Sequence, residues 1–408
     1  MIFSRTPSFQ RMKTQMIRSF LAVYFLSTAF AWSETNFVDA PIRLDGIFLN
    51  TATKKELDPI LFQNLSLCVA ENMVAIRESC TGRTEYLRHY RCKQFPNLFN
   101  DECNIGVTQF WIAPVAVFCN QEHLKNLRGY RATSPGIIIG IDSQPNSRTI
   151  TGVVAAYTNT NMHWKRTHSK VGKAHIQSAY FGCYGTYLND CFYVNASVIG
   201  SYEWYKVRRH LHVFTHLHKD VDLRDRLPRE RRDPRLVHFF KRTAKNRHKG
   251  YAVNSHLGTG LQLAFGILKV EPFANVDYDF VDQDGYRERG ANALDLRVKA
   301  NRAHLLRSEA GATMSYCIPY NCAKFRPSLS LSYVRKDILQ GDKFYSEFIR
   351  KDEYLTSTGT KKALQFVSPS LGIEVLFSNN YIFSINYTAE INSQAWVQRG
   401  MISFERLY

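Results

Sequence analysis

Four histidines close together are the first residues of this chain whose type and spacing could do chemistry. His210, His212, His216 and His218 form two alternating pairs, and on a strand each pair would project its imidazoles to one side, where they could bind a metal ion. The alternative is a basic loop whose histidines titrate at acidic pH. We favour the loop, and the sequence therefore predicts neither a metal site nor a cofactor.

The same part of the chain is strongly basic. Residues 206–249 contain fifteen Lys or Arg against five acidic residues, within a chain whose formal net charge is +18. Guanidinium groups bind phosphate and sulfate through paired hydrogen bonds. The candidate anion-binding residues are Arg229, Arg231, Arg232 and Arg235. Their expected ligands are lipopolysaccharide phosphates or sulfated host glycans. A solvated loop without a partner is equally compatible with this composition. Because the stretch interrupts an alternating pattern, we interpret it as a long loop and predict no nucleic-acid partner.

Residues for covalent catalysis do not form a recognisable set. An esterase would need a serine in a G-x-S-x-G motif, yet residues 32–107 contain no such motif and one histidine, His89. Ser178, Ser197 and His256 lie further along, but no spacing pairs them. We predict that the protein is not an enzyme.

Nine cysteines indicate an oxidising compartment. Cys317 and Cys322 flank four residues, and Cys183 and Cys191 flank a tight turn, so each pair could close a local disulfide or remain as independent thiols. No C-x-x-C pair suggests a structural zinc site.

The elements that must position these residues are predicted from an alternating pattern. From Phe192 to Trp204, apolar or aromatic residues occupy every second position, and similar segments recur over residues 108–408. Such a segment has one apolar face and one polar face. A transmembrane β-barrel and a soluble sandwich both show this pattern. The 49 Phe and Tyr residues, 27 and 22, favour the barrel, whose rings gather at two interfaces.

The N-terminal region has a different character. Basic residues precede an apolar stretch that ends at Ala29-Phe30-Ala31, which predicts a signal peptide over residues 1–31. The stretch is shorter than the roughly twenty residues of a spanning helix. Within a short segment at 32–107, a helix is expected over about 54–89, because Asp58-Pro59 suits a helix start and apolar residues follow at helical spacing.

Twelve strands are expected in residues 108–408, with short and long connections alternating between them. The expected strands are 108–119, 136–143, 149–160, 174–188, 191–208, 250–267, 270–283, 292–317, 325–337, 363–377, 381–392 and 396–408. The long connections are 120–135, 161–173, 209–249, 284–291 and 338–362. The predicted fold is all-β: a twelve-stranded antiparallel transmembrane β-barrel with an N-terminal α-helix in its lumen.

The motifs in this region resemble the β-domain of bacterial autotransporters, the type V secretion translocators. The similarity covers about 300 residues and is strongest at Leu257-Gly258-Thr259-Gly260, at 271–278, at 285–291 and at 306–311. It implies an integral protein of the outer membrane that exports or displays an N-terminal segment. The short segment before the barrel departs from the family, whose members usually carry a long β-helical passenger, and implies a very short passenger. The resemblance also implies that lipid and lipopolysaccharide surround a monomer assembled by the barrel-assembly machinery.

Polar residues on the expected strands are candidates for the inside of the barrel. Asn275, Asp277 and Asp279 share one face, and three polar groups toward lipid would be costly, so we expect them in the lumen. Glu288, Arg289 and Arg307 are candidates for an internal ion pair or loop brace, or for solvated loop charge.

The last strand resembles the signal that barrel-assembly machinery recognises. Gly400, Ile402, Phe404 and Tyr408 fit that pattern, whereas Arg406 occupies a position where an apolar side chain is expected. Two alternatives to export remain open at this point. One is a passenger-free surface adhesin or structural barrel that binds anionic surfaces through residues 209–249, and the other is a small pore.

Overall fold

The computed structural model describes most of the chain. The described residues are 43–44, 47–49, 62–91, 108–123, 128–165, 172–189, 191–216, 237–320, 323–349, 354–360, 363–377 and 381–406. Apart from Arg43, they belong to one compact unit, Leu44–Tyr408. The expected signal peptide and the candidate anion-binding residues Arg229, Arg231, Arg232 and Arg235 lie outside the described residues.

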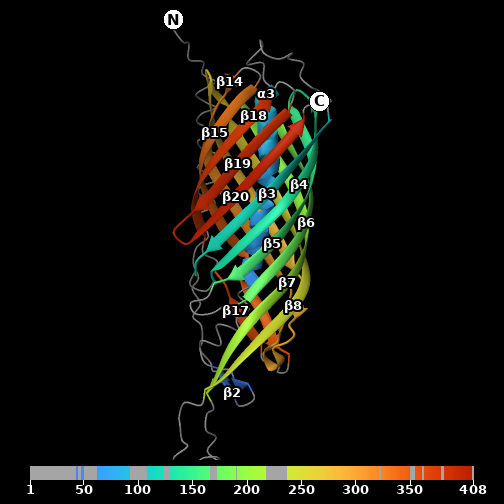
Figure 1. Cartoon of the computed structure of the whole chain (residues 1–408), viewed down its shortest axis with the longest axis vertical. Coiled ribbons are helices and arrows are strands. Elements are labelled where there is room, and N and C mark those ends of the chain that lie inside the picture. Colours follow the sequence, from blue (N-terminus) through green and yellow to red (C-terminus); the bar gives the residue numbers. More distant parts are fainter. Residues whose placement is uncertain are drawn as a thin grey trace, which may run out of the picture. The chain divides into compact units, whose positions relative to one another are not determined.

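The main element of this unit is a closed antiparallel barrel, which twelve of the described strands form (Figure 1). Each strand pairs with its neighbours in chain order, including β7 with β8, and the pairing of the first strand, β3, with the last, β20, closes the ring. This confirms the predicted fold class. The barrel strands are β3 (Thr108–Gln121), β4 (Tyr130–Asn146), β5 (Thr149–Trp164), β6 (Gly172–Leu188), β7 (Phe192–His216), β8 (Val237–Leu261), β10 (Leu268–Gln283), β13 (Asn301–Tyr316), β15 (Ala323–Gln340), β18 (Leu364–Phe377), β19 (Tyr381–Ile391) and β20 (Ala395–Arg406).

Alternation along the strands produces two faces of opposite character. On β4 the side chains of Ile137, Ile139 and Ile141 are exposed on the outer surface, while Asp142 and Ser134 are buried inside. Because side chains of consecutive strand residues point to opposite faces, the apolar set can only face outward when the polar set faces the lumen. An apolar exterior over a polar interior is typical of a barrel whose solvent is lipid.

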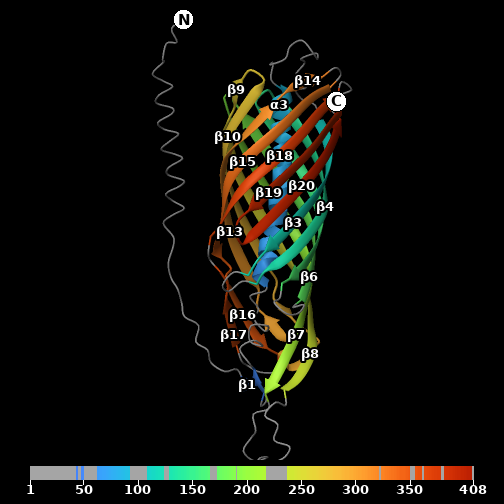
Figure 2. The same cartoon turned by 60° about the vertical axis from the view of Figure 1, so that its left-hand side comes forward.

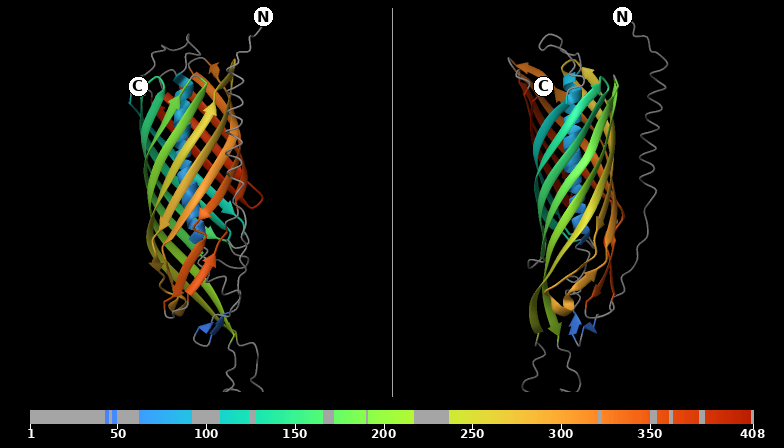
Figure 3. Two further views of the ribbon diagram at one scale, coloured as in Figure 1. Left: turned by 180° about the vertical axis from the view of Figure 1, so that it is seen from behind. Right: turned by 90° about the vertical axis from the view of Figure 1, so that its right-hand side faces the viewer.

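Within the described residues, one α-helix, α3 (Gln63–Arg91), runs through the lumen (Figures 2 and 3). The helix was expected over about 54–89; it begins at Gln63, and residues 54–61 lie outside the described residues. Apolar and charged side chains of α3 are buried alike, including Leu65, Met73, Arg77 and Arg83. A helix that is polar around much of its surface needs partners on all sides, and the barrel wall supplies them. In the described part of the chain, no helix is both long and apolar enough to span a membrane.

A second, four-stranded sheet lies at one end of the barrel and corrects the expected connections. Residues 284–291 and 338–362 were predicted as loops, but they contribute β11 (Tyr286–Arg287), β16 (Lys343–Phe348) and β17 (Tyr354–Thr358), which form a sheet with β12 (Leu296–Val298). The expected single strand 292–317 is divided into a 3-10 turn at Asn292–Leu294, β12 and β13. The remaining short strands are β1 (Arg43–Leu44), β2 (Ile47–Leu49), β9 (Leu263–Phe265) and β14 (Ile318–Tyr320).

Apolar and aromatic contacts hold this sheet against the end of the barrel. Phe344, Phe348 and Leu296 are almost fully buried. The Tyr286 ring stacks on His248 and meets Phe62 edge-on, with ring centroids 4.4 and 5.1 Å apart. Burial raises the pKa of Tyr286 well above its ordinary value, so its hydroxyl stays protonated. These side chains were missed because short strands interrupted by charged residues give little periodic signal.

The predicted loop over residues 209–249 is wrong in its extent. Strand β7 continues to His216 and β8 begins at Val237, so both strands extend beyond their neighbours (Figure 1). Val207 and Leu211 are buried while Lys206 and Arg208 are exposed, which shows that on β7 the alternation continues into the basic stretch as far as Leu211. Net charge alone therefore does not end a strand; Lys and Arg are tolerated wherever their side chains reach water.

The structure decides between the two alternatives that the sequence left open for Cys183 and Cys191. Cys183 and Cys191 are free thiols rather than a disulfide, and Cys317 is also free. Cys183 lies on β6 opposite Val198, facing outward, whereas Cys191 precedes β7 at the turn. Cys322, the expected partner of Cys317, lies outside the described residues.

Gly140 provides the first testable prediction. A Cβ atom at this position would overlap the ring of Trp111, which is buried and donates a hydrogen bond from Nε1 to the Tyr184 hydroxyl at 2.9 Å. We expect Gly140→Ala to lower the free energy of unfolding by about 1–3 kcal/mol, because the ring has to move. Gly400→Ala is the matched control, since a Cβ there meets nothing within 4 Å. Urea unfolding of both variants in detergent measures the difference, and equal stabilities would contradict the prediction.

Candidate functional site

The candidate site is the lumen around α3, where the helix meets the wall through charged side chains. Glu71, Glu78 and Glu85 recur every seven residues and so lie close to one face of the helix. Arg77, Arg83 and Arg88 are fixed on α3 among acidic and amide groups of the wall. A bare charge in a buried environment is costly, so each of these groups needs a partner of opposite charge.

Asp277 on β10 is the centre of the first cluster. Its side chain is fully buried, and it accepts hydrogen bonds at 3.1 Å from Arg77 on the helix and at 3.1 Å from Arg307 on β13. The ring of His256 on β8 contacts its other oxygen through Nδ1 at 2.7 Å. Arg307 also donates to Glu390 at 2.9 Å. One wall carboxylate thus joins the helix to two neighbouring strands.

Arg399 on β20 forms the second cluster, which shares Glu390 with the first. Its guanidinium donates two hydrogen bonds to Glu78 of the helix, at 2.7 and 2.9 Å, and further bonds to Glu71 at 3.2 Å and Glu390 at 2.5 Å. Lys336 on β15 pairs with the same Glu71 and Glu390. The paired geometry of Arg399 with Glu78 fixes both the rotation and the height of the helix.

Two further arginines, Arg83 and Arg88, belong to the C-terminal half of α3. Arg83 donates to both oxygens of Asp142 at 2.7 and 3.1 Å and to Gln109 at 2.5 Å, and it pairs with Glu405. The guanidinium of Arg88 lies 3.6 Å from the centre of the Tyr193 ring and 3.4 Å from Glu271. Both contacts lie near the barrel end at which β3 starts.

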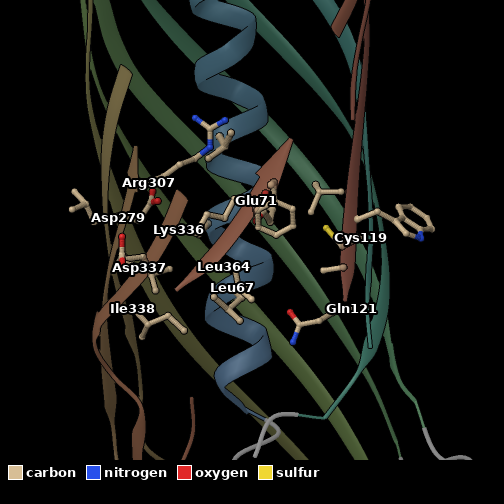
Figure 4. Close-up of a pocket in the computed structure, with 18 of the residues that line it drawn as sticks. Leu67, Glu71, Cys119, Gln121, Asp279, Arg307, Lys336, Asp337, Ile338 and Leu364 are labelled. Atoms are coloured by element: carbon tan, nitrogen blue, oxygen red, sulfur yellow. Dashed lines mark hydrogen bonds and ion pairs between the residues drawn. The ribbon is translucent and has the colours of Figure 1, made fainter. Parts of the chain in front are cut away.

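At its N-terminal end the helix is held mainly by amides and apolar contacts. Gln63 donates to the Thr360 carbonyl at 3.0 Å, and Asn64 donates to the Arg128 carbonyl at 2.9 Å. Leu67 and Glu71 lie on α3 beside a pocket, with Lys336 and Ile338 projecting from the wall (Figure 4). Leu67 also packs against the buried cluster that contains Leu364 and Phe366. Apolar packing inside the lumen had not been predicted.

The lumen is not completely filled. A cavity of about 170 Å³ lies beside Glu78, Gly82 and Glu85 of the helix, and five serines of the wall line it: Ser328, Ser330, Ser332, Ser368 and Ser370. Hydroxyl groups offer both donors and acceptors, so this space suits water.

The structure brings most of the sequence-predicted residues to the lumen or its rim. Besides Asp277 and Arg307, Asn275 donates to Glu309 at 3.2 Å, and Asp279 accepts from Asn254 at 2.8 Å. Glu288 is fully buried, binds Arg209 of the β7 extension and accepts from the Leu296 backbone at 3.2 Å. Arg289, in contrast, is exposed, and its backbone pairs with Lys245.

The remaining predicted residues lie elsewhere. Gly400, Ile402 and Phe404 are on β20, where Ile402 and Phe404 face outward, while Tyr408 lies outside the described residues. His210 contacts Thr243 at 3.1 Å, and the described part of the chain contains no group of three or more potential metal ligands. The helix residues Arg77 and Glu78 and the wall residue Arg399 were missed. The seven-residue spacing of Glu71, Glu78 and Glu85 was the available signal.

Comparisons with known proteins agree with this architecture. A sequence model of the autotransporter β-domain family matches residues 110–388. The chain is 22% identical over 298 residues to outer membrane protein A of Rickettsia conorii and 23% identical to that of Rickettsia rickettsii. These matches cover 72% of this chain but only 14% and 12% of the relatives' length. The translocator domain of the autotransporter NalP from Neisseria meningitidis superimposes with a TM-score of 0.53 at 14% identity, over 83% of this chain and 98% of that domain.

The last comparison shows a shared fold, because its sequence identity is low. The family match extends over more than half of the chain and includes β3 through β19 nearly entirely. This protein therefore belongs to the autotransporter β-domain family and is an integral protein of the outer membrane.

Proposed function

We propose that this barrel carries the chain segment preceding α3 to the outer surface of the membrane and anchors it there. The observation that supports the proposal is the direction of α3 in the lumen. Gln63 and Asn64 are held at the end of the barrel that has the long connections, next to the four-stranded sheet. Arg83 and Arg88 are held near the opposite end, where β3 begins. The chain before α3 therefore leaves at the end with the long connections.

The orientation of the barrel in the membrane determines on which side of the membrane the chain before α3 lies. In outer-membrane barrels the short turns face the periplasm and the longer loops face outward. The connection between β4 and β5 is short and lies at the end where β3 begins, whereas β7 and β8 extend far beyond the other end. A chain that enters α3 from the long-loop end has its preceding residues outside the cell.

Buried ion pairs explain how a polar helix can stay in the barrel after export. In the lumen, the described charged side chains of α3 exchange water for partners on the wall, so the assembled state keeps these charges satisfied. No covalent step is needed, and translocator barrels of this family are not generally enzymes. Barrels of this family are generally assembled by the barrel-assembly machinery and surrounded by lipid and lipopolysaccharide. We propose that the outward alternation of Ile402 and Phe404 on β20 serves recognition by that machinery.

An epitope inserted after Ala31 tests the proposal on intact cells. We expect externally added protease to remove this epitope, because the residues before α3 would lie outside. The matched control is the same epitope inserted at Ser147, in the short connection between β4 and β5. It should resist protease until the outer membrane is permeabilised. Protection of the first epitope together with cleavage of the second on intact cells would contradict the proposed direction.

The adhesin alternative has no comparable support. It depends on Arg229, Arg231, Arg232 and Arg235, which lie outside the described residues. We therefore do not propose binding of host glycans for this chain.

A further inference from the structure

A row of basic side chains crosses the outer surface of the barrel near its long-loop end. The residues in this row are directly opposite one another on neighbouring strands β4 to β8. They are Arg131, His163, Lys173, Arg208 and Lys245, and the backbone of Arg289 pairs with Lys245 at the end of the row. A second row two residues along contains His175, Lys206 and Arg247. We call these nine residues the basic belt.

In the described part of the chain, the belt residues form no close ion pairs, although Glu122 lies near enough to Arg131 to interact with its charge. Eight of the belt side chains are exposed and His175 is half-buried. Lys173 lies opposite Arg208, Arg208 opposite Lys245, and Lys206 opposite Arg247. Like charges directly opposite each other destabilise a sheet. The arrangement therefore calls for anions from outside the protein.

The position of the belt selects the kind of anion. Next to it, on the side of the barrel centre, lies a band of exposed aromatic residues, Tyr157, Tyr202, Trp204 and Tyr251. Beyond these rings the outer surface is apolar, with Phe181 and Val198 exposed. Tyr and Trp rings mark the boundary between the hydrocarbon and the headgroups of a membrane. The belt thus follows the polar side of the aromatic band, and an occupant that also covers the apolar surface needs acyl chains.

The width of the belt indicates more than one phosphate. Its longer row crosses six adjacent segments, and because neighbouring strands are about 4.8 Å apart, the row is roughly 24 Å wide. Guanidinium and ammonium groups spread over this width match several anionic groups at once. We propose that the basic belt binds a lipid of the outward-facing leaflet whose headgroup carries two or more phosphates. This goes beyond export and does not depend on it, because it needs only the barrel in its membrane.

Binding of bis-phosphorylated lipid A to the purified full chain in detergent tests the proposal. The belt variant is Lys206→Gln/Arg208→Gln/Arg247→Gln. Its affinity for lipid A should fall about a hundredfold, since each basic side chain near an anionic surface contributes about 1 kcal/mol. The control variant is Arg148→Gln/Lys269→Gln/Lys324→Gln, which removes the same charge at the short-turn end and should bind within about twofold of the original chain.

Two sets of controls accompany this experiment. One distinguishes a phosphorylated lipid from free phosphate, and the other detects a variant that has not folded. Dephosphorylated lipid A and inorganic phosphate should bind weakly or not at all, because one lacks the anions and the other the acyl chains. Heat-dependent migration on gels reports whether the belt variant is folded. If the belt variant is not folded, the proposal is tested by measuring lipid A binding to the original chain at increasing salt concentration. This binding should weaken steeply with ionic strength. Equal loss in both variants, tight binding of dephosphorylated lipid A or of phosphate alone, or binding that ignores salt would overturn the proposal.

Discussion

Replacing Asp277 with Asn should lower the free energy of unfolding by about 3–5 kcal/mol, the cost of removing one partner of a buried ion pair. Asp277 is fully buried and is shared by Arg77, Arg307 and His256. An amide has the same shape as a carboxylate but no charge. The guanidinium groups of Arg77 and Arg307 would therefore stay buried without the anion that they share. Urea unfolding of the full chain in detergent, followed by tryptophan fluorescence, measures the loss.

Two further variants make this result specific. Asp284→Asn changes an exposed carboxylate just beyond β10 and should alter stability by less than about 0.5 kcal/mol. Arg77→Met/Asp277→Leu removes both charges, and we expect it to cost less than the sum of its single variants. A loss below about 1 kcal/mol for Asp277→Asn would show that the lumen is well hydrated and that the helix does not depend on this cluster.

The second large effect concerns ion conduction. With α3 in place, the lumen holds a helix about 10–12 Å in diameter including its side chains, and a cavity of about 170 Å³ lies beside it. Deleting residues 32–91 removes the helix, and we expect the conductance of the barrel in planar bilayers to rise several-fold. The polar wall of Asp277, Glu309, Glu390 and Arg399 would then line a water-filled channel.

The control keeps the helix and removes one contact at its end. Gln63→Ala eliminates the hydrogen bonds with Thr360 but leaves the ion pairs of Arg77 and Glu78 intact, so its conductance should remain near that of the original chain. Equal conductance with and without α3 would mean that other segments close the lumen, and that the helix is not what blocks the barrel.

Alternation in the sequence was sufficient to predict the barrel and the polar face of β10. The polar positions 275, 277 and 279 follow from a period of two, because a strand has only two faces and lipid tolerates just one kind of side chain. The helix was predicted for a similar reason, from spacing along a single segment. The same local logic fails at β7 and β8, where the charge predicts a loop although the alternation on β7 continues to Leu211.

Partner choice, in contrast, was decided by the tertiary structure. Arg77 meets Asp277 across 200 residues of sequence, and Arg399 reaches Glu78 from the last strand of the ring. Periodicity assigns a residue to a face, but the height of each strand in the ring determines which turn of the helix it meets. That height is set by the registers of all twelve strands and by the closing β3–β20 pairing. Only the closed ring therefore places Asp277, Arg307 and Glu390 around the same turns of α3.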